Sequence, residues 1–374
     1  MKISIGAKTF DGPWGGGNLF VKNLAEYLRS KGHKVCFDLY SDDLDLILLT
    51  DPRKTSSSSA FTHKEIINYK KYINNDVLVV HRINECDERK NTIGQNDFFI
   101  EANKCADSTI FVSEWLKSIY ESLGLKNDNR VIMTGANKKI FNNENRTIWD
   151  KKNKLKIVSH HWSGNWNKGF DIYKRLDQLL NEKKYKDIVE YTYIGNLPNK
   201  FAFNNTKHIE PLEGSLLANE LKKNHIYLTG SLNEPSGNHH IEAAQCGLPL
   251  LFINSGGIPE FCQGFGVQFD NEDFEIKLDE IISKYDFYVK KIESYPFSSN
   301  LMSEEYERLF LDLINKDFNN DFHLELEYLI ENKNFFMLKR KISKIIDNNF
   351  LLSKFILIQK KIVLRLKSLI GKND

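Results

Sequence analysis

The alternation of apolar runs with amphipathic segments limits the fold of this chain more than any other feature of its sequence. Residues 2–7 form a short apolar run, residues 18–31 carry apolar side chains at three- and four-residue steps, and residues 35–39 are apolar again. The first and third segments are typical of strands and the second is typical of a helix. A strand, a helix and a strand in succession form a βαβ unit, which predicts a parallel sheet.

The same alternation continues along the chain with one interruption. A polar stretch at residues 142–153 breaks the pattern, which restarts at residue 155. We therefore predict two α/β domains of similar size, residues 1–150 and 151–315. The further strands that we predict are residues 45–49, 77–80, 109–112, 155–159, 190–194, 225–228 and 249–253, and the further helices are residues 113–123, 170–180, 215–223, 238–246 and 303–314.

A third segment, residues 316–374, differs from both domains in charge. The 374-residue chain has a net charge of +2, but residues 333–374 hold eleven Lys or Arg and two Asp and so carry +9, which leaves −7 for the first 332 residues. An acidic body argues against nucleic acid as a partner. Apolar side chains recur at helical spacing in residues 335–372 with Lys and Arg between them, which predicts a basic amphipathic helix. This helix is a candidate for binding an anionic membrane surface, for packing on the protein body or for pairing with a partner helix.

The cysteines and the first residues of the chain favour a cytoplasmic protein, at most peripheral at the inner face of a membrane. The five cysteines include no C-x-x-C pair, so we predict neither a zinc site nor a redox motif. The N-terminus lacks the apolar segment of a signal peptide, and no stretch reaches about 18 uninterrupted apolar residues. The triplet Asp43-Leu44-Asp45 is similar to a metal-binding pattern, but we interpret it as the end of a strand.

The strongest chemical signal is the segment 234–249, which reads EPSGNHHIEAAQCGLP. Glu234 and Glu242 flank Gly237 at the predicted start of a helix. The backbone N–H groups of Gly237, Asn238 and His239 would lie at the helix N-terminus, where a phosphate binds without a metal. There Glu242 can accept hydrogen bonds from a ribose diol, and Glu234 can reach a sugar hydroxyl. The alternative, a loop acid and a solvated helical acid, stays open on these residues alone.

This segment resembles the E-x(7)-E signature of the family 4 glycosyltransferases, which are retaining nucleotide-sugar enzymes of the GT-B fold. Pro235-Ser236 stands where the family usually has Gly-Phe. The resemblance covers roughly residues 1–315 and implies two facing Rossmann-like domains with parallel sheets. The positions that match the family's motifs are Glu234, Gly237, Glu242, Ala243, Gly247 and Pro249, the G-G-x-P-E loop at residues 256–260, and the glycines Gly15, Gly16 and Gly17 before the first helix.

The resemblance also implies a role for individual residues. Glu234 would contact the donor sugar, Lys168 would neutralise the leaving diphosphate, and His81 would lie on the acceptor side. A solvated lysine and a surface histidine are the alternatives for the last two. The resemblance implies no metal and no cofactor apart from the donor. The donor-binding residues would be Gly16, Gly17, Arg82, His161, Gly237, Asn238, His239, Glu242, Gly256 and Gly257.

One departure from the family concerns the positive charge near the diphosphate. The family usually has an Arg five residues before the lysine, but this chain has Ser163 there. His160, His161 and Arg82 are candidate replacements for that cation.

The function that the resemblance implies is transfer of a sugar from a nucleotide diphospho-sugar to a hydroxyl acceptor, with retention of configuration. The acceptor would be a glycan or a lipid-linked molecule in surface polysaccharide or glycan biosynthesis. Two alternatives remain: a non-catalytic nucleotide-sugar-binding protein of the same fold, favoured by Ser163, and a sugar-nucleotide epimerase.

Overall fold

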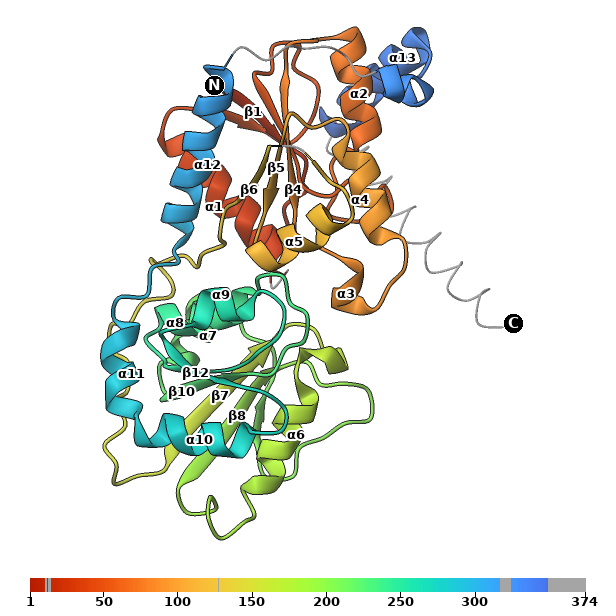
Figure 1. The fold of residues 1–374 in the computed structure, drawn as a ribbon. Helices are drawn as coiled ribbons and strands as arrows, with labels where there is room; N and C mark the ends of the chain where they lie inside the picture. The colour runs from red at the N-terminus through yellow and green to blue at the C-terminus, as the bar shows by residue number, and fades with distance from the viewer. Residues whose placement is uncertain (11, 13–14, 127, 317–323, 349–374) are drawn as a thin grey trace.

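The computed structural model describes residues 1–374 except 11, 13–14, 127, 317–323 and 349–374. Two α/β domains lie one above the other, each built on a six-stranded sheet (Figure 1). All strand pairs within both sheets are parallel. This arrangement confirms the two parallel-sheet domains that the sequence alternation predicts.

The first sheet has the strand order β2-β1-β3-β4-β5-β6. Its strands are β1 (Lys2–Ile5), β2 (Lys34–Cys36), β3 (Leu46–Leu49), β4 (Leu78–Ile83), β5 (Ser108–Phe111) and β6 (Asn129–Val131). The helices of this part are α1 (Gly16–Ser30), α2 (His63–Tyr72), α3 (Asp87–Lys90), α4 (Gln95–Asn103) and α5 (Glu114–Ser122). We did not predict α2, α3, α4 or β6, because these segments are short and polar and carry a weak apolar pattern.

The second sheet has the strand order β12-β11-β10-β7-β8-β9. Its strands are β7 (Leu155–His161), β8 (Val189–Gly195), β9 (Lys207–Ile209), β10 (Ile226–Thr229), β11 (Leu250–Ile253) and β12 (Gly266–Phe269). The helices are η1 (Trp166–Lys168), α6 (Phe170–Leu179), α7 (Gly214–Leu221), α8 (Asn238–Gln245), α9 (Ile258–Cys262), α10 (Phe274–Ser283) and α11 (Tyr285–Ile292).

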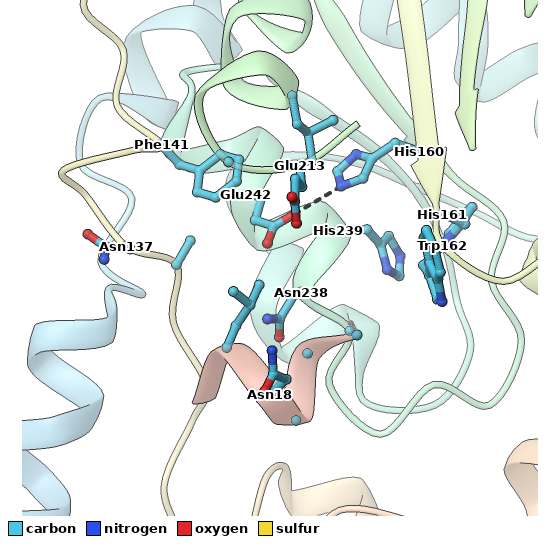
Figure 2. A pocket seen from close by; sticks show the side chains of 18 of the residues that line it. Asn18, Asn137, Phe141, His160, His161, Trp162, Glu213, Asn238, His239 and Glu242 are labelled. Atoms are coloured by element: carbon cyan, nitrogen blue, oxygen red, sulfur yellow. Dashed lines mark hydrogen bonds and ion pairs between the residues drawn. The ribbon is translucent and has the colours of Figure 1, made fainter. Parts of the chain in front are cut away.

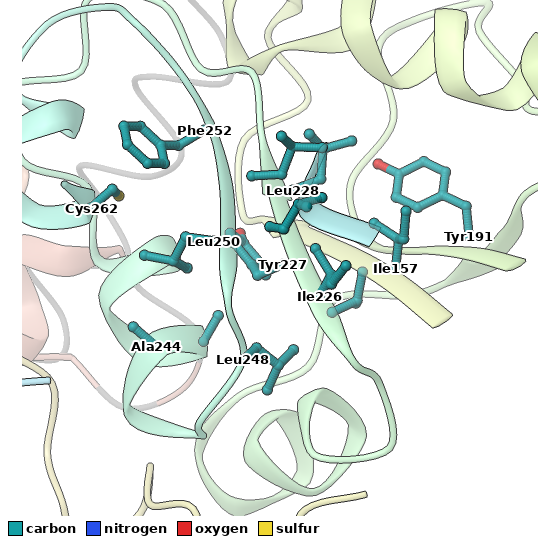
Figure 3. Close-up of a cluster of buried hydrophobic side chains, with 14 of the residues drawn as sticks. Ile157, Tyr191, Ile226, Tyr227, Leu228, Ala244, Leu248, Leu250, Phe252 and Cys262 are labelled. Carbon is teal, nitrogen blue, oxygen red and sulfur yellow. The ribbon is translucent and has the colours of Figure 1, made fainter. Parts of the chain in front are cut away.

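The core of the second domain explains why its strands read as continuous apolar runs. Helices cover both faces of the sheet, so successive side chains of a central strand are all buried. In β10, Ile226, Tyr227 and Leu228 are fully buried, and Leu250 of β11 packs beside them (Figure 3).

Helix α12 (Ser299–Ile314) follows the second domain in the chain but packs against the first sheet (Figure 1). It begins before the predicted residue 303, because the Ser298 hydroxyl accepts a hydrogen bond from the Leu301 backbone N–H and caps it. Its Tyr306 ring lies 5.3 Å from the Phe20 ring of α1. The structure thus places residues 299–314 with the first domain, whereas the sequence predicts that they belong to the second.

Helix α13 (Lys333–Asn348), preceded by the short helix η2 (Leu324–Leu329), contains the described part of the predicted basic amphipathic helix. Residues 349–372 of that prediction lie outside the described residues. One face packs on the first domain, where the Phe336 ring lies 5.9 Å from the Tyr72 ring and Arg340 donates a 3.0 Å hydrogen bond to the Leu39 carbonyl. Among the described residues, no helix combines the length and the apolarity needed to cross a bilayer.

Candidate active site

A cavity of about 740 Å³ is lined by residues of both domains (Figure 2). The first domain contributes the start of α1, the ends of β4 and α3, and the loop at residues 135–141. The second domain contributes the end of β7, η1, residues 211–217 at the start of α7, and the segment 234–242. Since parallel strands of an α/β sheet end at the edge where ligands bind, this cavity is the position expected of an active site.

Two helix N-termini meet at this cavity. Helix α1 begins at Gly16 and α8 begins at Asn238, and no side chain among the described residues caps either helix. A Cβ atom on Gly16 would lie 3.0 Å from the Asn238 amide carbon, so glycine permits the close approach of the two helices. Figure 2 shows Asn238 directed toward the first turn of α1, where Asn18 lies. Two converging helix N-termini favour an anion such as a phosphate.

Gly237 shapes the turn between Glu234 and α8. Its φ angle is 71°, a left-handed conformation that favours glycine. A Cβ atom there would lie 2.9 Å from Cγ of Glu234 and 2.7 Å from the His239 ring. The turn therefore brings Glu234 close to the start of α8, as the E-x(7)-E spacing predicts.

Glu234 is buried and carries two cations on one carboxylate. Lys168, at the end of η1, forms an ion pair with Oε2, and Arg89 Nη2 lies 2.9 Å from Oε1. Burial by itself raises the pKa of Glu234, but the charges of Lys168 and Arg89 outweigh it and hold the pKa below its ordinary value. The carboxylate is therefore ionised at neutral pH and can accept hydrogen bonds from a ligand.

Glu242 lies one turn inside α8 and is 6% exposed. His160 Nε2, at the end of β7, lies 3.0 Å from Oε2 of Glu242 (Figure 2). Both side chains line the cavity. The imidazole orients the carboxylate toward the space where a ligand would bind.

Four buried histidines gather at the end of β7 and the start of α8, namely His160, His161, His239 and His240. The rings of His161 and His239 lie 4.4 Å apart, and His161 Nε2 lies 2.6 Å from the Tyr173 hydroxyl. Burial lowers the pKa of His161 and His239 well below the ordinary value and that of His240 to about 3. Because the pKa of His161 is lowered in the ligand-free protein, Arg82 is a stronger candidate than His161 for the cation missing at Ser163. In the described part of the chain, no three His, Cys, Asp or Glu are grouped so as to hold a metal.

Arg82 lines the cavity from the first domain and is only 4% exposed. Its guanidinium lies 4.0 Å from the centre of the Phe20 ring, and its Nε atom has no hydrogen-bond partner among the described residues. Burial lowers the pKa of this guanidinium. Arg82 is therefore a buried cation that an anionic ligand would stabilise.

Three residues that the sequence predicts at the site, His81, Gly256 and Gly257, do not line the cavity. His81 is fully buried, with Nδ1 2.8 Å from Asn103 Oδ1 and its ring stacked on Phe99. Strand β4 runs on to Ile83 instead of ending at residue 80, so His81 points to the opposite face of the sheet from Arg82. We therefore do not retain His81 as a catalytic residue.

Gly256 and Gly257 pack against the backbone of Glu234. The Gly257 N–H donates a 2.9 Å hydrogen bond to the Glu234 carbonyl. A Cβ atom on Gly256 would lie 2.6 Å from the same carbonyl oxygen. These glycines hold the loop of Glu234 and do not face the cavity. The remaining predicted residues line it, namely Gly16, Gly17, Arg82, His161, Lys168, Glu234, Gly237, Asn238, His239 and Glu242.

Arg89 is a cavity residue that we did not predict. It belongs to α3, a four-residue helix directly after the polar loop that follows β4. Its place shortly after a strand end, in a run of charged residues, is the signal that could have indicated it.

Comparisons with known proteins identify the fold. No protein-family model matches the chain, and no curated protein does. Among solved structures, HepE of Anabaena in complex with UDP-glucose is similar with a TM-score of 0.61 and 14% identity, over 83% of this chain and 100% of that one. A glycosyltransferase of Rickettsia africae gives 0.60 and 13% identity, over 84% of this chain and 98% of that one.

Sucrose-phosphate synthase of Thermosynechococcus elongatus is also similar, with a TM-score of 0.56 and 14% identity over 83% of this chain and 98% of that one. Identities this low show the fold alone. Together with the two six-stranded parallel sheets and the cavity that both domains line, these similarities establish that the chain has the GT-B fold.

Proposed function

We propose that this protein is a retaining glycosyltransferase of the family 4 type, which transfers a sugar from a nucleotide diphospho-sugar to an acceptor hydroxyl. One observation carries the proposal: an ionised Glu234 and the cation Lys168 lie beside two helix N-termini in one cavity. Helix N-termini and a lysine favour a diphosphate, and a buried carboxylate favours sugar hydroxyls. Solved glycosyltransferases with the same fold support the assignment, among them one bound to UDP-glucose.

The donor would lie mainly on the second domain. The N–H groups at the start of α8 would bind the diphosphate, and Glu242 would accept hydrogen bonds from the ribose hydroxyls. Glu234 would hold the sugar through a hydroxyl. Gly16 and Gly17 would let the backbone of the first domain approach the phosphates from the other side. No metal or cofactor takes part in this proposal.

The transfer exchanges one bond at the anomeric carbon for another on the same face of the sugar. The bond from the anomeric carbon to the diphosphate oxygen breaks, and a bond to the acceptor oxygen forms. The acceptor's proton passes to the leaving diphosphate, and Lys168 neutralises the charge that develops there. Closure of the two domains would exclude water and so limit hydrolysis of the donor.

A calorimetric binding screen with UDP, GDP and ADP, and then with their sugars, tests the proposal. We expect micromolar binding of one nucleotide and its loss in Glu242→Gln, which removes the charge but retains a partner for His160. Glu190→Ala is the matched control, because Glu190 is exposed on β8 outside the cavity. Absence of binding by any nucleotide would contradict the proposal.

Turnover then separates the remaining functions. A glycosyltransferase releases the nucleoside diphosphate only when an acceptor is added. An epimerase converts the sugar of the donor in the absence of any acceptor. Binding without any product would identify a non-catalytic protein.

We also propose that the protein works on the cytoplasmic side of an anionic membrane, on a glycan or lipid-linked acceptor in surface polysaccharide biosynthesis. The five cysteines are all free, which suits a reducing compartment. The outer side of α13 supports membrane docking. Its exposed apolar side chains recur at helical spacing among exposed lysines, namely Phe335, Leu338, Ile342 and Ile345 with Lys341 and Lys344.

Sedimentation with vesicles of phosphatidylglycerol and phosphatidylcholine tests the docking. We expect Leu338→Glu/Ile342→Glu to lower the bound fraction several-fold, because both changes place a negative charge on the apolar side. Ile276→Glu on α10 is the control, since Ile276 is also exposed but lies on the second domain outside the cavity. Unchanged binding of the double variant would contradict docking through α13.

A further inference from the structure

Arg89 joins the two domains beside the proposed diphosphate position. Its Nη2 atom lies 2.9 Å from Glu234 Oε1 in the second domain. Its Nη1 atom donates a 3.1 Å hydrogen bond to Glu85 Oε2 in the first domain. The guanidinium thus bridges two carboxylates that belong to different domains. Its own pKa is raised, chiefly by the charge of Glu234.

The backbone of α3 is held against the residues that precede both members of the Lys168–Glu234 pair. The Asn167 side-chain amide donates a 2.7 Å hydrogen bond to the Arg89 carbonyl. The Asn233 side-chain amide donates a 3.1 Å hydrogen bond to the Glu88 carbonyl. These two bonds place Arg89 and Lys168 side by side on one carboxylate.

The cations at this point outnumber the carboxylates. Arg89, Lys90 and Lys168 carry three positive charges, whereas their partners Glu85 and Glu234 carry two negative charges. Arg89, Lys168 and Glu234 line the cavity at which two helix N-termini meet. A diphosphate brings at least two further negative charges. Arg89 can release Glu234 without losing all its partners, because Glu85 remains and a guanidinium has five N–H donors.

We propose that Arg89 binds the β-phosphate of the donor and so holds the diphosphate across the two domains. This inference rests on the proposed function. Glu234 would contact the sugar, and the sugar is bonded to the β-phosphate, so the guanidinium beside Glu234 is within reach of that phosphate. When Arg89 exchanges Oε1 of Glu234 for phosphate oxygens, that carboxylate oxygen becomes free to accept a hydrogen bond from a sugar hydroxyl. A guanidinium binds phosphate through two parallel N–H donors, which orients the leaving group.

Calorimetry with pairs of nucleotides tests this role. The nucleoside diphosphate that the wild-type protein binds is compared with its monophosphate, for example UDP with UMP. In Arg89→Gln we expect the affinity for the diphosphate to fall about 10- to 100-fold, since a hydrogen bond to a charged group is lost. The affinity for the monophosphate should stay within about twofold, because it has no β-phosphate for Arg89 to contact.

Lys90→Gln is the matched control for Arg89→Gln. Lys90 lies on the same helix and pairs with Glu85 at 3.0 Å, but it does not line the cavity. We expect wild-type affinities for both nucleotides in this variant. Should Arg89→Gln fail to fold, Arg89→Lys provides the same comparison with a smaller loss for the diphosphate.

Two results would overturn the role of Arg89 and leave the proposed function standing. One is an equal loss for diphosphate and monophosphate, which would mean that Arg89 only holds the domains together. The other is an unchanged affinity for the diphosphate. A wild-type protein that binds no nucleotide at all would overturn the inference and the proposed function together.

Discussion

The carboxylate of Glu260, in α9 of the second domain, accepts a 2.7 Å hydrogen bond from the backbone N–H of Trp115, at the start of α5 in the first domain. Its other oxygen accepts a second 2.7 Å hydrogen bond, from the N–H of Glu114. Glu260 therefore caps a helix that belongs to the opposite domain. A negative charge at a helix N-terminus is stabilising, so this contact favours the arrangement in which the two domains face each other closely.

Removing the Glu260 carboxylate should loosen this contact between the domains. For Glu260→Ala we expect a loss of about 0.5–2 kcal/mol of stability, the usual cost of losing a helix cap. We also expect a larger radius of gyration in small-angle X-ray scattering, because one interdomain contact is missing. Glu121→Ala is the control, since Glu121 is exposed near the opposite end of the same helix. Identical scattering from Glu260→Ala and wild type would show that this cap does not hold the domains together.

Arg82 should strengthen nucleotide binding but lower the stability of the ligand-free protein. The Arg82 guanidinium is buried, and its Nε atom has no hydrogen-bond partner among the described residues. Replacing it by an apolar side chain, as in Arg82→Met, should raise the free energy of unfolding by about 1–3 kcal/mol. The same change should weaken nucleoside diphosphate binding by about tenfold or more. Chemical denaturation and calorimetry measure the two effects.

Arg53→Met provides the contrast to Arg82→Met. Arg53 Nε lies 2.8 Å from Asp51 Oδ1, so its removal leaves a carboxylate without its partner and should lower stability. A destabilised Arg82→Met protein would show that Arg82 has a structural role in the absence of a ligand.

Replacing Lys168 should lower the rate of sugar transfer more than it lowers the affinity for the donor. For Lys168→Met we expect the rate of sugar transfer to fall about 100- to 1000-fold, because the charge on the leaving diphosphate is no longer neutralised in the transition state. Glu234 keeps Arg89 as a partner in this variant, so the fold should persist. Steady-state kinetics with the donor found by calorimetry measures the effect, with the exposed Lys174→Met on α6 as control. A change confined to KM would contradict a transition-state role.

Acid should destabilise the protein through His81. Burial lowers the pKa of His81 from 6.5 to about 4. Below pH 6.5 the unfolded chain binds a proton that the folded protein rejects, so stability falls as pH drops from 6.5 to 4, by up to about 3 kcal/mol for this residue. We expect His81→Gln to show a smaller decrease in melting temperature between pH 7.5 and pH 5, because the unfolded chain's histidine gains its proton within that range.

The control for the acid effect is His208→Gln, because His208 is exposed to water on β9 in the folded protein. Its pH dependence should match that of the wild type. His81→Gln should also bind nucleotide like the wild type at pH 7.5, since His81 does not line the cavity. Loss of nucleotide binding in His81→Gln would show that His81 contributes to the active site.

Much of the fold and part of the site follow from short-range features of the chain. Apolar runs and helical periodicity act within one strand or one helix, so they predict the two parallel sheets before any packing is known. Glu234, Gly237 and Glu242 lie in one loop and the helix that follows it, so their spacing predicts their common position at the cavity.

The tertiary structure decided what depends on contacts between distant segments. Strand β4 continues past residue 80 because it pairs with β5 as far as Ile83, and this extension turns His81 away from the cavity and Arg82 toward it. Arg89 reaches Glu234 only because α3 is held against the second domain. Such relationships join residues that lie from tens to more than a hundred positions apart, so a local sequence pattern does not predict them. The sequence by itself determined two parallel-sheet domains and the helix start at Asn238 that we predict to bind an anion. Packing between the domains decided which cations lie beside that helix start.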